Sequence, residues 1–124
     1  MRLARPLLIA LAVLLPLTGA ASAEARRKAT HAERAAIAAK FDAPPKCAKV
    51  FVSTVDRHWA SYRFDGRRFD DPDCRPAAAD GVAILQRRNG RWRMVTAGSS
   101  FDCPVPRTPP KVAADLRVRC VDQR

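Results

Sequence analysis

The stretch "GVAILQRRNGRWRMVTAGSS", residues 81–100, carries the strongest fold signal in the chain. Apolar and polar side chains alternate on both sides of Asn89-Gly90, as in two strands that each bury one face. An Asn-Gly pair favours a type I′ turn, because both central residues of that turn need positive φ. The sequence therefore predicts a β-hairpin with its tip at residues 89–90.

The predicted turn also fixes which side chains of the hairpin share a face. With a two-residue loop, Arg88 is expected opposite Arg91, and Arg93 is expected on the same face two residues further along. The same register places Ile84 opposite Val95. The other face is expected to carry Leu85, Arg87, Trp92 and Met94.

The hairpin tip is the candidate binding site, and it consists of Arg87, Arg88, Arg91, Trp92 and Arg93. Clustered arginines suit an anionic polymer, and basic residues interleaved with an aromatic ring also suit single-stranded nucleic acid, although no nucleic-acid-binding motif accompanies them. The competing interpretation is structural: Arg87 stacks on Trp92 in a cation–π contact of about 0.5–1 kcal/mol, and the other arginines keep a sheet edge soluble. From the sequence we favour the structural interpretation and keep polymer binding as the functional hypothesis.

A helix is predicted over residues 30–41. Thr30 and Glu33 have the spacing of a capping box, in which each side chain bonds to the backbone N–H of the other residue. Ile37 and Phe41 lie four residues apart and form one narrow apolar face, and prolines end the helix shortly afterwards. Such a narrow face needs a sheet to pack on.

Residues 47–56 and 59–64 are predicted to form a second antiparallel pair of strands, joined by a tight turn. Residues 65–80 have turn chemistry throughout, and residues 109–118 predict a short helix. The expected fold class is therefore α+β, with an N-terminal helix packed on a four-stranded antiparallel meander, a short C-terminal helix and two disulfides.

The N-terminus has the layout of a secretory signal peptide. Arg2 and Arg5 precede an apolar run, Leu7–Leu17, and small residues then lead to an A-x-A site that ends at Ala23. The run is about half as long as a membrane-spanning helix and contains Pro16. We therefore expect cleavage after Ala23 and export of the remainder.

The expected mature chain consists of a flexible arm over residues 24–29 and one secreted domain over residues 30–124, with no further apolar stretch of membrane-spanning length. It has 101 residues, and loss of Arg2 and Arg5 lowers the Lys+Arg count from 23 to 21 against 12 Asp+Glu, a net charge of +9. A basic surface attracts anionic polymers, nucleic acid or lipid head groups. A bias toward GC-rich codons would give the same charge without a ligand.

Four cysteines are expected to compensate for a small hydrophobic core. Leu, Ile, Val and Phe make up 18 of the 101 mature residues, below the roughly 20% at which a highly charged chain tends toward disorder. Four cysteines in a small exported chain predict two disulfides, each worth about 3 kcal/mol. We expect Cys47–Cys74 and Cys103–Cys120, although the other two pairings remain open. Zinc is disfavoured, because successive cysteines lie 27, 29 and 17 positions apart.

The stretches "GRWRMVTAGSSFDCP" and "VPRTPPKVAADLRVRC" resemble those of uncharacterised small secreted proteins of actinobacteria, over about residues 35–120. The layout of helix and strands is also similar to cystatin-like and NTF2-like domains, which wrap a curved sheet on a helix. Cystatin-type inhibitors use a Q-x-V-x-G loop, and residues 86–90 lack its valine, so the inhibitory contact does not carry over. NTF2-like enzymes place Asp and His in the cone of the sheet, and no matching pair is found on strand positions.

Patterns for catalysis or metal binding are weak. His58 and Asp56 are interpreted as turn residues rather than as a general base with its partner, and His31 lies in the first turn of the predicted helix. The acidic run 70–73 departs from the ligand spacing of an EF-hand. The arginines expected to neutralise this run are Arg67, Arg68 and Arg75.

The sequence thus predicts a small secreted, non-catalytic protein without metal or cofactor, which binds through its basic surface outside the cell or at the cell envelope. The expected partner is an anionic extracellular polymer or another protein. Two alternatives remain, a secreted inhibitor or protein-partner module and, least favoured, an enzyme with an NTF2-like pocket.

Overall fold

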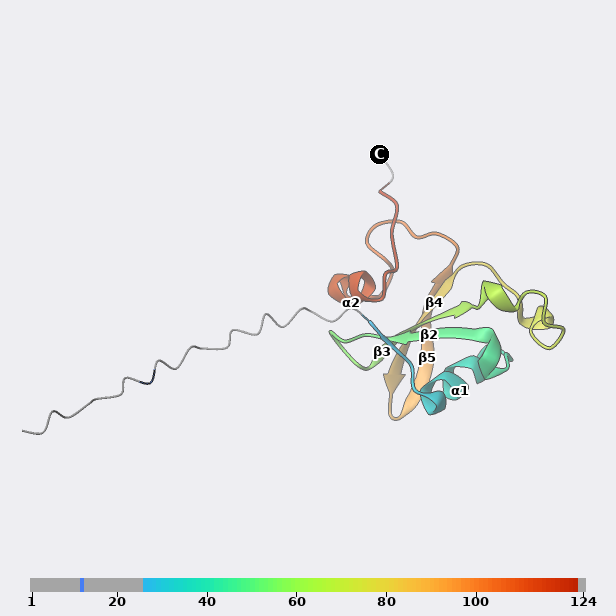
Figure 1. Cartoon of the computed structure of the whole chain (residues 1–124). Helices are drawn as coiled ribbons and strands as arrows, with labels where there is room; N and C mark the ends of the chain where they lie inside the picture. The colour runs from blue at the N-terminus through green and yellow to red at the C-terminus, as the bar shows by residue number, and fades with distance from the viewer. Residues whose placement is uncertain (1–11, 13–25, 123–124) are drawn as a thin grey trace, which may run out of the picture.

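A computed structural model describes residue 12 and residues 26–122 of the chain. The predicted signal peptide and its cleavage site lie outside the described residues, apart from Ala12, and both stay predictions. The described domain is a sheet with helix α1 (His31–Ala39) on one side and helix α2 (Pro110–Asp115) on the other (Figure 1).

The sheet has five antiparallel strands that follow one another in chain order. They are β1 (Arg27–Lys28), β2 (Ala48–Val52), β3 (Trp59–Phe64), β4 (Val82–Arg88) and β5 (Arg91–Gly98). Short 3-10 helices in the connections span Pro45–Cys47, Gly66–Arg68 and Arg75–Ala77. The predicted α+β class and both helices are confirmed, and the sheet has one strand more than the four predicted.

The additional strand comes from the predicted flexible arm. Arg27 pairs with Val52 and Lys28 pairs with Phe51 along the outer edge of β2. Arg26 places its guanidinium 3.6 Å from the centre of the Phe51 ring and donates a hydrogen bond to the carbonyl of Leu116 at 3.2 Å. Residues 26–28 are therefore held in place rather than loose. The sequence gives no sign of this, because a two-residue strand has no periodicity and is held by the backbone of β2.

Strands β4 and β5 form the predicted hairpin. Asn89 and Gly90 take φ values of 50° and 73°, as a type I′ turn requires. Arg88 pairs with Arg91 on either side of this turn, which confirms the predicted register at the tip.

The register changes further from the turn. Leu85 pairs with Met94, but Ile84 pairs with Thr96, so the predicted pairing of Ile84 with Val95 is wrong. Val95 is the extra residue of a β-bulge. Ile84 and Val95 still pack in the same hydrophobic cluster, so the bulge keeps both side chains on the α2 side of the sheet.

Two hydrophobic clusters lie on opposite faces of the sheet. The cluster on the α1 side contains Ile37, Ala38, Val50, Val52, Leu85 and Trp92. The cluster on the α2 side contains Trp59, Ile84, Phe101, Val112, Leu116 and Val118. Side chains therefore fill both faces at the centre of the sheet.

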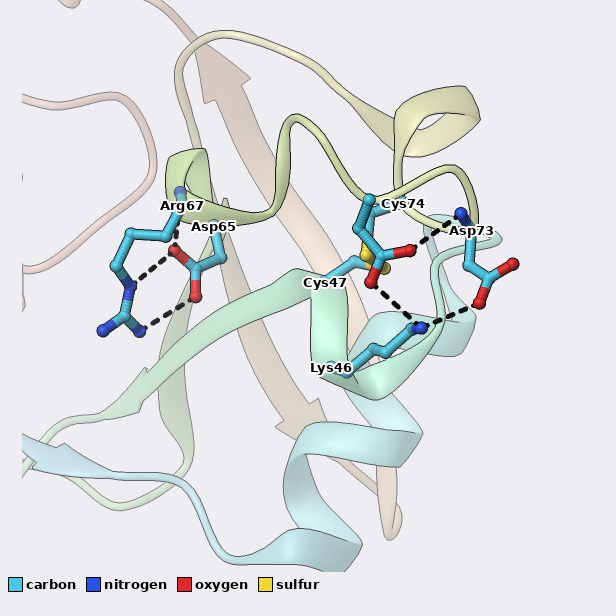
Figure 2. The surroundings of a disulfide bond; sticks show 7 residues. Lys46, Cys47, Asp65, Arg67, Asp73 and Cys74 are labelled. Carbon is cyan, nitrogen blue, oxygen red and sulfur yellow. Dashed lines mark hydrogen bonds and ion pairs between the residues drawn. A yellow bond between two sulfur atoms is a disulfide. The ribbon is translucent and has the colours of Figure 1, made fainter.

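Both disulfides form the predicted pairs, Cys47–Cys74 and Cys103–Cys120. Cys47 and Cys74 are fully buried, and their bond joins the start of β2 to the irregular connection that precedes β4 (Figure 2). The second bond joins two points of the C-terminal segment on either side of α2.

In the described residues the ion-pair partner of the acidic run is a lysine, and the charge of Arg68 is a smaller cause of the lowered pKa of Asp71. The Nζ atom of Lys46 lies 3.0 Å from Asp71 Oδ2 and 2.8 Å from Asp73 Oδ2 (Figure 2). Arg67, which was expected to neutralise this run, instead pairs with Asp65. Lys46 lies 27 positions before Asp73 and reaches it beside the Cys47–Cys74 bond, a proximity that local sequence does not reveal.

The predicted capping box is present at the start of α1. Thr30 Oγ1 accepts a hydrogen bond from the backbone N–H of Glu33 at 3.2 Å, and Glu33 Oε1 accepts one from the Thr30 N–H at 2.9 Å. Arg27 donates two further bonds to the same carboxylate, at 2.7 and 3.0 Å. These bonds, those from Arg27 foremost, lower the pKa of Glu33 to about 2.

We expect the variant Cys47→Ala/Cys74→Ala to lose about 3 kcal/mol of unfolding free energy, because this disulfide restricts the unfolded chain over a separation of 27 residues. Urea denaturation measures the loss. The variant Cys103→Ala/Cys120→Ala is the matched comparison and should lose slightly less, since its separation is 17. Identical urea midpoints for the oxidised and fully reduced wild type would contradict this role of the disulfides.

The Arg27–Glu33 ion pair, together with the capping box, should make stability depend on pH in the acid range. The folded state depresses the pKa of Glu33 from 4.5 to about 2, so its contribution is complete above pH 4.5 and disappears as the pH falls toward 2. We expect Glu33→Gln to cost about 1 kcal/mol at neutral pH, since the ion pair is partly exposed, and almost nothing at pH 2. Unfolding free energies of both proteins between pH 2 and 6 test this, and a constant difference would refute it.

Candidate functional site

The hairpin tip places three arginines on one face of the sheet. Arg88 and Arg91 lie directly opposite each other, and Arg93 follows on the same face. All three are exposed, and Arg88 Nε donates a hydrogen bond to Gln86 Oε1 at 2.9 Å. Like charges on directly opposed strand positions repel, so this arrangement does not stabilise the sheet.

A fourth arginine joins the cluster from the C-terminal segment. Arg107, in the connection between β5 and α2, lines a recess of about 240 Å³ together with Arg88, Arg93, Met94 and Val95. Its φ of 54° lies in the left-handed region, which costs a residue with a Cβ about 1–2 kcal/mol. Sequence analysis missed Arg107, because it lies in an irregular connection and only the tertiary fold brings it to the hairpin.

We call Arg88, Arg91, Arg93 and Arg107 the hairpin arginines. Within the described part of the chain, none of them forms an ion pair, and no acidic side chain lines the recess that Arg88, Arg93 and Arg107 share. Guanidinium groups donate paired N–H bonds to phosphate, sulfate and carboxylate groups. An oxyanion in this recess would gain such bonds and would also reduce the repulsion between the arginines.

Trp92 and Arg87 do not belong to this recess. Trp92 is 6% exposed and packs in the hydrophobic cluster on the α1 side. Arg87 pairs with Trp92 across the hairpin, but the predicted cation–π contact between them is not formed. The contact of this kind in the described residues is that of Arg26 with Phe51. Side chains alternate along the two strands, so Arg87 and Trp92 project from the face opposite to that of Arg88, Arg91 and Arg93.

A second basic groove runs beside β1 and the outer edge of β2. It has a volume of about 520 Å³, and its charged lining residues are Lys28, Arg34, Lys46, Lys49, Asp65, Arg67 and Arg68. Part of this charge is neutralised internally, because Lys46 binds Asp71 and Asp73 and Arg67 binds Asp65. The hydrogen bond from Arg67 is the main cause of a lowered pKa of Asp65. This groove is the weaker candidate for an anion.

The candidate catalytic pair is a turn structure. His58 Nδ1 lies 3.0 Å from Asp56 Oδ1, which also accepts the backbone N–H of His58 at 3.0 Å. The backbone bond is the first cause of the lowered pKa of Asp56. Both side chains are exposed, at 57% and 43%, and they close the turn between β2 and β3. This geometry agrees with the interpretation of Asp56 and His58 as turn residues.

The most apolar hollow lies beside the Cys103–Cys120 disulfide. It has a volume of about 660 Å³ and is lined by Cys103, Pro104, Val105, Pro110, Ala113, Ala114, Val118, Arg119 and Cys120. This lining provides one charged group and no acidic residue that could serve as a general base. Across the described residues, no cluster of three or more His, Cys, Asp or Glu has a geometry that could hold a metal ion.

The chain has no significant match among family models, curated proteins or solved structures. The resemblance to small secreted actinobacterial proteins therefore stays a prediction. In residues 12 and 26–122, no helix has the length and apolarity needed to cross a membrane.

We expect Trp92→Ala to lower the free energy of unfolding, and not only the affinity for a ligand. A buried tryptophan truncated to alanine costs about 3–5 kcal/mol, and Trp92 is 6% exposed. Its neighbour Met94 is 61% exposed, so Met94→Ala is the control and should cost less than about 0.5 kcal/mol. Chemical denaturation of the two variants gives the comparison, and equal losses would show that Trp92 does not support the core.

Proposed function

We propose that this protein is a small secreted binding module that holds an anionic extracellular polymer at the hairpin arginines and catalyses no reaction. The observation that carries the proposal is the convergence of Arg88, Arg93 and Arg107 on one recess without an acidic partner among the described residues. The positive charges of these three arginines, which come from two separate segments, repel one another, and Arg107 in addition takes an unfavourable left-handed backbone conformation.

The recess suits a substituted polymer more than a small neutral molecule. Its arginines stand on the rigid strands of a hairpin and on a connection that is closed by the Cys103–Cys120 bond. Bidentate contacts from such positions orient sulfate, phosphate or carboxylate groups on a chain. The exposed Met94 at the rim can cover apolar parts of the same ligand.

Secretion is part of the proposal. Two disulfides are formed, and such bonds persist in oxidising compartments outside the cytosol. The N-terminal sequence supports the same location through its basic start, apolar run and A-x-A site. A net charge of +9 after cleavage would further attract polyanions over a distance of about 8 Å at physiological ionic strength.

The test is retention on a heparin column at about 0.15 M salt. We expect the variant Arg88→Ala/Arg91→Ala/Arg93→Ala to elute without retention, because three of the four guanidinium donors are lost. The control is Lys40→Ala/Arg68→Ala/Arg75→Ala, which removes the same charge from exposed positions away from the hairpin tip. This control should elute close to wild type, and equal loss in both variants would reduce the effect to net charge.

A wild-type protein that heparin and purified anionic wall polymers do not retain at this salt would refute the proposal. The alternative of a protein partner is distinguished by the same variants. If a protein ligand bound the triple hairpin variant as tightly as wild type, the hairpin arginines would not form its contact.

A further inference from the structure

A second recess with unpaired arginines lies at the other end of β4. It has a volume of about 270 Å³, and its lining includes Arg63, Gly81, Val82, Arg117 and Arg119. We call it the Arg63 recess. Its described lining residues include no acid, and none of its three arginines forms an ion pair within the described residues.

Neighbouring cations add to the charge at this recess. Lys49 on β2 lies directly opposite Arg63 on β3, a placement that is unfavourable for like charges. Arg26 lies on Phe51, which follows two residues after Lys49 on the same face of β2. Burial lowers the pKa of Arg26, and the charges of Arg117 and Arg63 lower it further. The repulsion is thus a property of the folded arrangement.

Asp115, an acid that acts on Arg26, is already engaged by other partners. Asp115 Oδ2 accepts hydrogen bonds from Ser53 Oγ and from the backbone N–H of Thr54, both at 2.8 Å. Its other oxygen accepts one from Thr54 Oγ1 at 3.2 Å. Among the influences on the pKa of Arg26, the charge of Asp115 is the smallest. This carboxylate ties α2 to the β2–β3 turn and leaves the Arg63 recess positively charged.

The backbone at Arg117 points to a role for its side chain. Val118 N–H donates to the carbonyl of Ala113 at 3.0 Å and Arg117 N–H donates to that of Ala114 at 3.1 Å, which is the Schellman pattern at the end of α2. The left-handed residue of this pattern is usually glycine, yet Arg117 occupies it with a φ of 58°. A residue unfavourable for the helix end therefore delivers a guanidinium to the recess.

We propose that the Arg63 recess is a second anion site, which binds a phosphate or sulfate group through Arg63, Arg117 and Arg119. The site is independent of the hairpin arginines and does not rest on the proposed function. Val82 lines this recess and Arg88 lines the other, so the two sites are about 20 Å apart along β4. The group is either a free anion or one substituent of a polymer that reaches both sites.

The test uses the oxidised protein and pyrophosphate as the probe, with binding followed by isothermal titration and by the Nε–Hε signals of arginine in NMR spectra. We expect Arg63→Gln and Arg117→Gly each to weaken pyrophosphate binding about tenfold, as the loss of a charged hydrogen-bond donor predicts. Arg117→Gly should also raise the melting temperature, since glycine relieves the left-handed backbone. A variant that is more stable and binds less cannot owe its loss of affinity to unfolding.

The matched control is Asp42→Gly. Asp42 holds the equivalent place after α1 with a φ of 51°, so this change relieves the same backbone conformation away from the Arg63 recess. It should leave pyrophosphate affinity unchanged, as should Arg75→Gln, which removes an exposed arginine elsewhere. The variant Arg88→Ala/Arg91→Ala/Arg93→Ala should still shift the signals of Arg63 and Arg117 on titration.

The proposal is overturned if wild type does not bind pyrophosphate, if Arg117→Gly binds it as tightly as wild type, or if only the hairpin variant loses binding. The source of the anion follows from competition in wild type. Displacement of pyrophosphate from this recess by heparin assigns the site to a polymer substituent, whereas absence of displacement assigns it to a free anion. Either result supports the site itself.

Discussion

The two disulfides are the constraint on which the structure depends. The hydrophobic clusters on the two faces of the sheet are small, and two long irregular segments, residues 65–81 and 99–109, contribute little regular backbone pairing. Ordering such segments costs roughly 1–2 kcal/mol of backbone entropy for each residue. Each disulfide holds one end in or beside one of these segments, at Cys74 and at Cys103, and so limits the conformations of the unfolded chain.

The C-terminal segment around the Cys103–Cys120 bond also carries arginines that line both recesses. Arg107 reaches the hairpin from the connection that begins near Cys103, and Arg117 and Arg119 lie just before Cys120. The Cys103–Cys120 bond holds this C-terminal segment in place. Its arginines therefore do not need ion pairs with acidic residues to keep the segment folded. Stability and an unneutralised basic surface are therefore compatible in so small a domain.

The charge of the described domain is unevenly balanced. The acids Glu33, Asp65, Asp71 and Asp73 have basic partners near α1, β1 and β2. The arginines on the α2 side form clusters at both ends of β4, without such partners among the described residues. Two of these arginines, Arg107 and Arg117, occupy left-handed backbone positions that glycine would fill more easily. Repulsion and backbone energy oppose this arrangement in the free protein, and an anionic ligand would offset the repulsion.

The sequence by itself determined the features that depend on neighbouring residues. Asn89-Gly90 set the turn and the Arg88–Arg91 pair, Thr30 and Glu33 set the start of α1, and cysteine spacing with element order suggested the disulfides. Tertiary structure decided what depends on packing or on distant partners. It added β1, introduced a bulge at Val95, paired Lys46 with the acidic run and brought Arg107 to the hairpin. The local sequence pattern indicates the preferred backbone conformation and the face on which a side chain lies. The features that it missed depend on contacts between segments far apart in the chain, which form only in the folded protein.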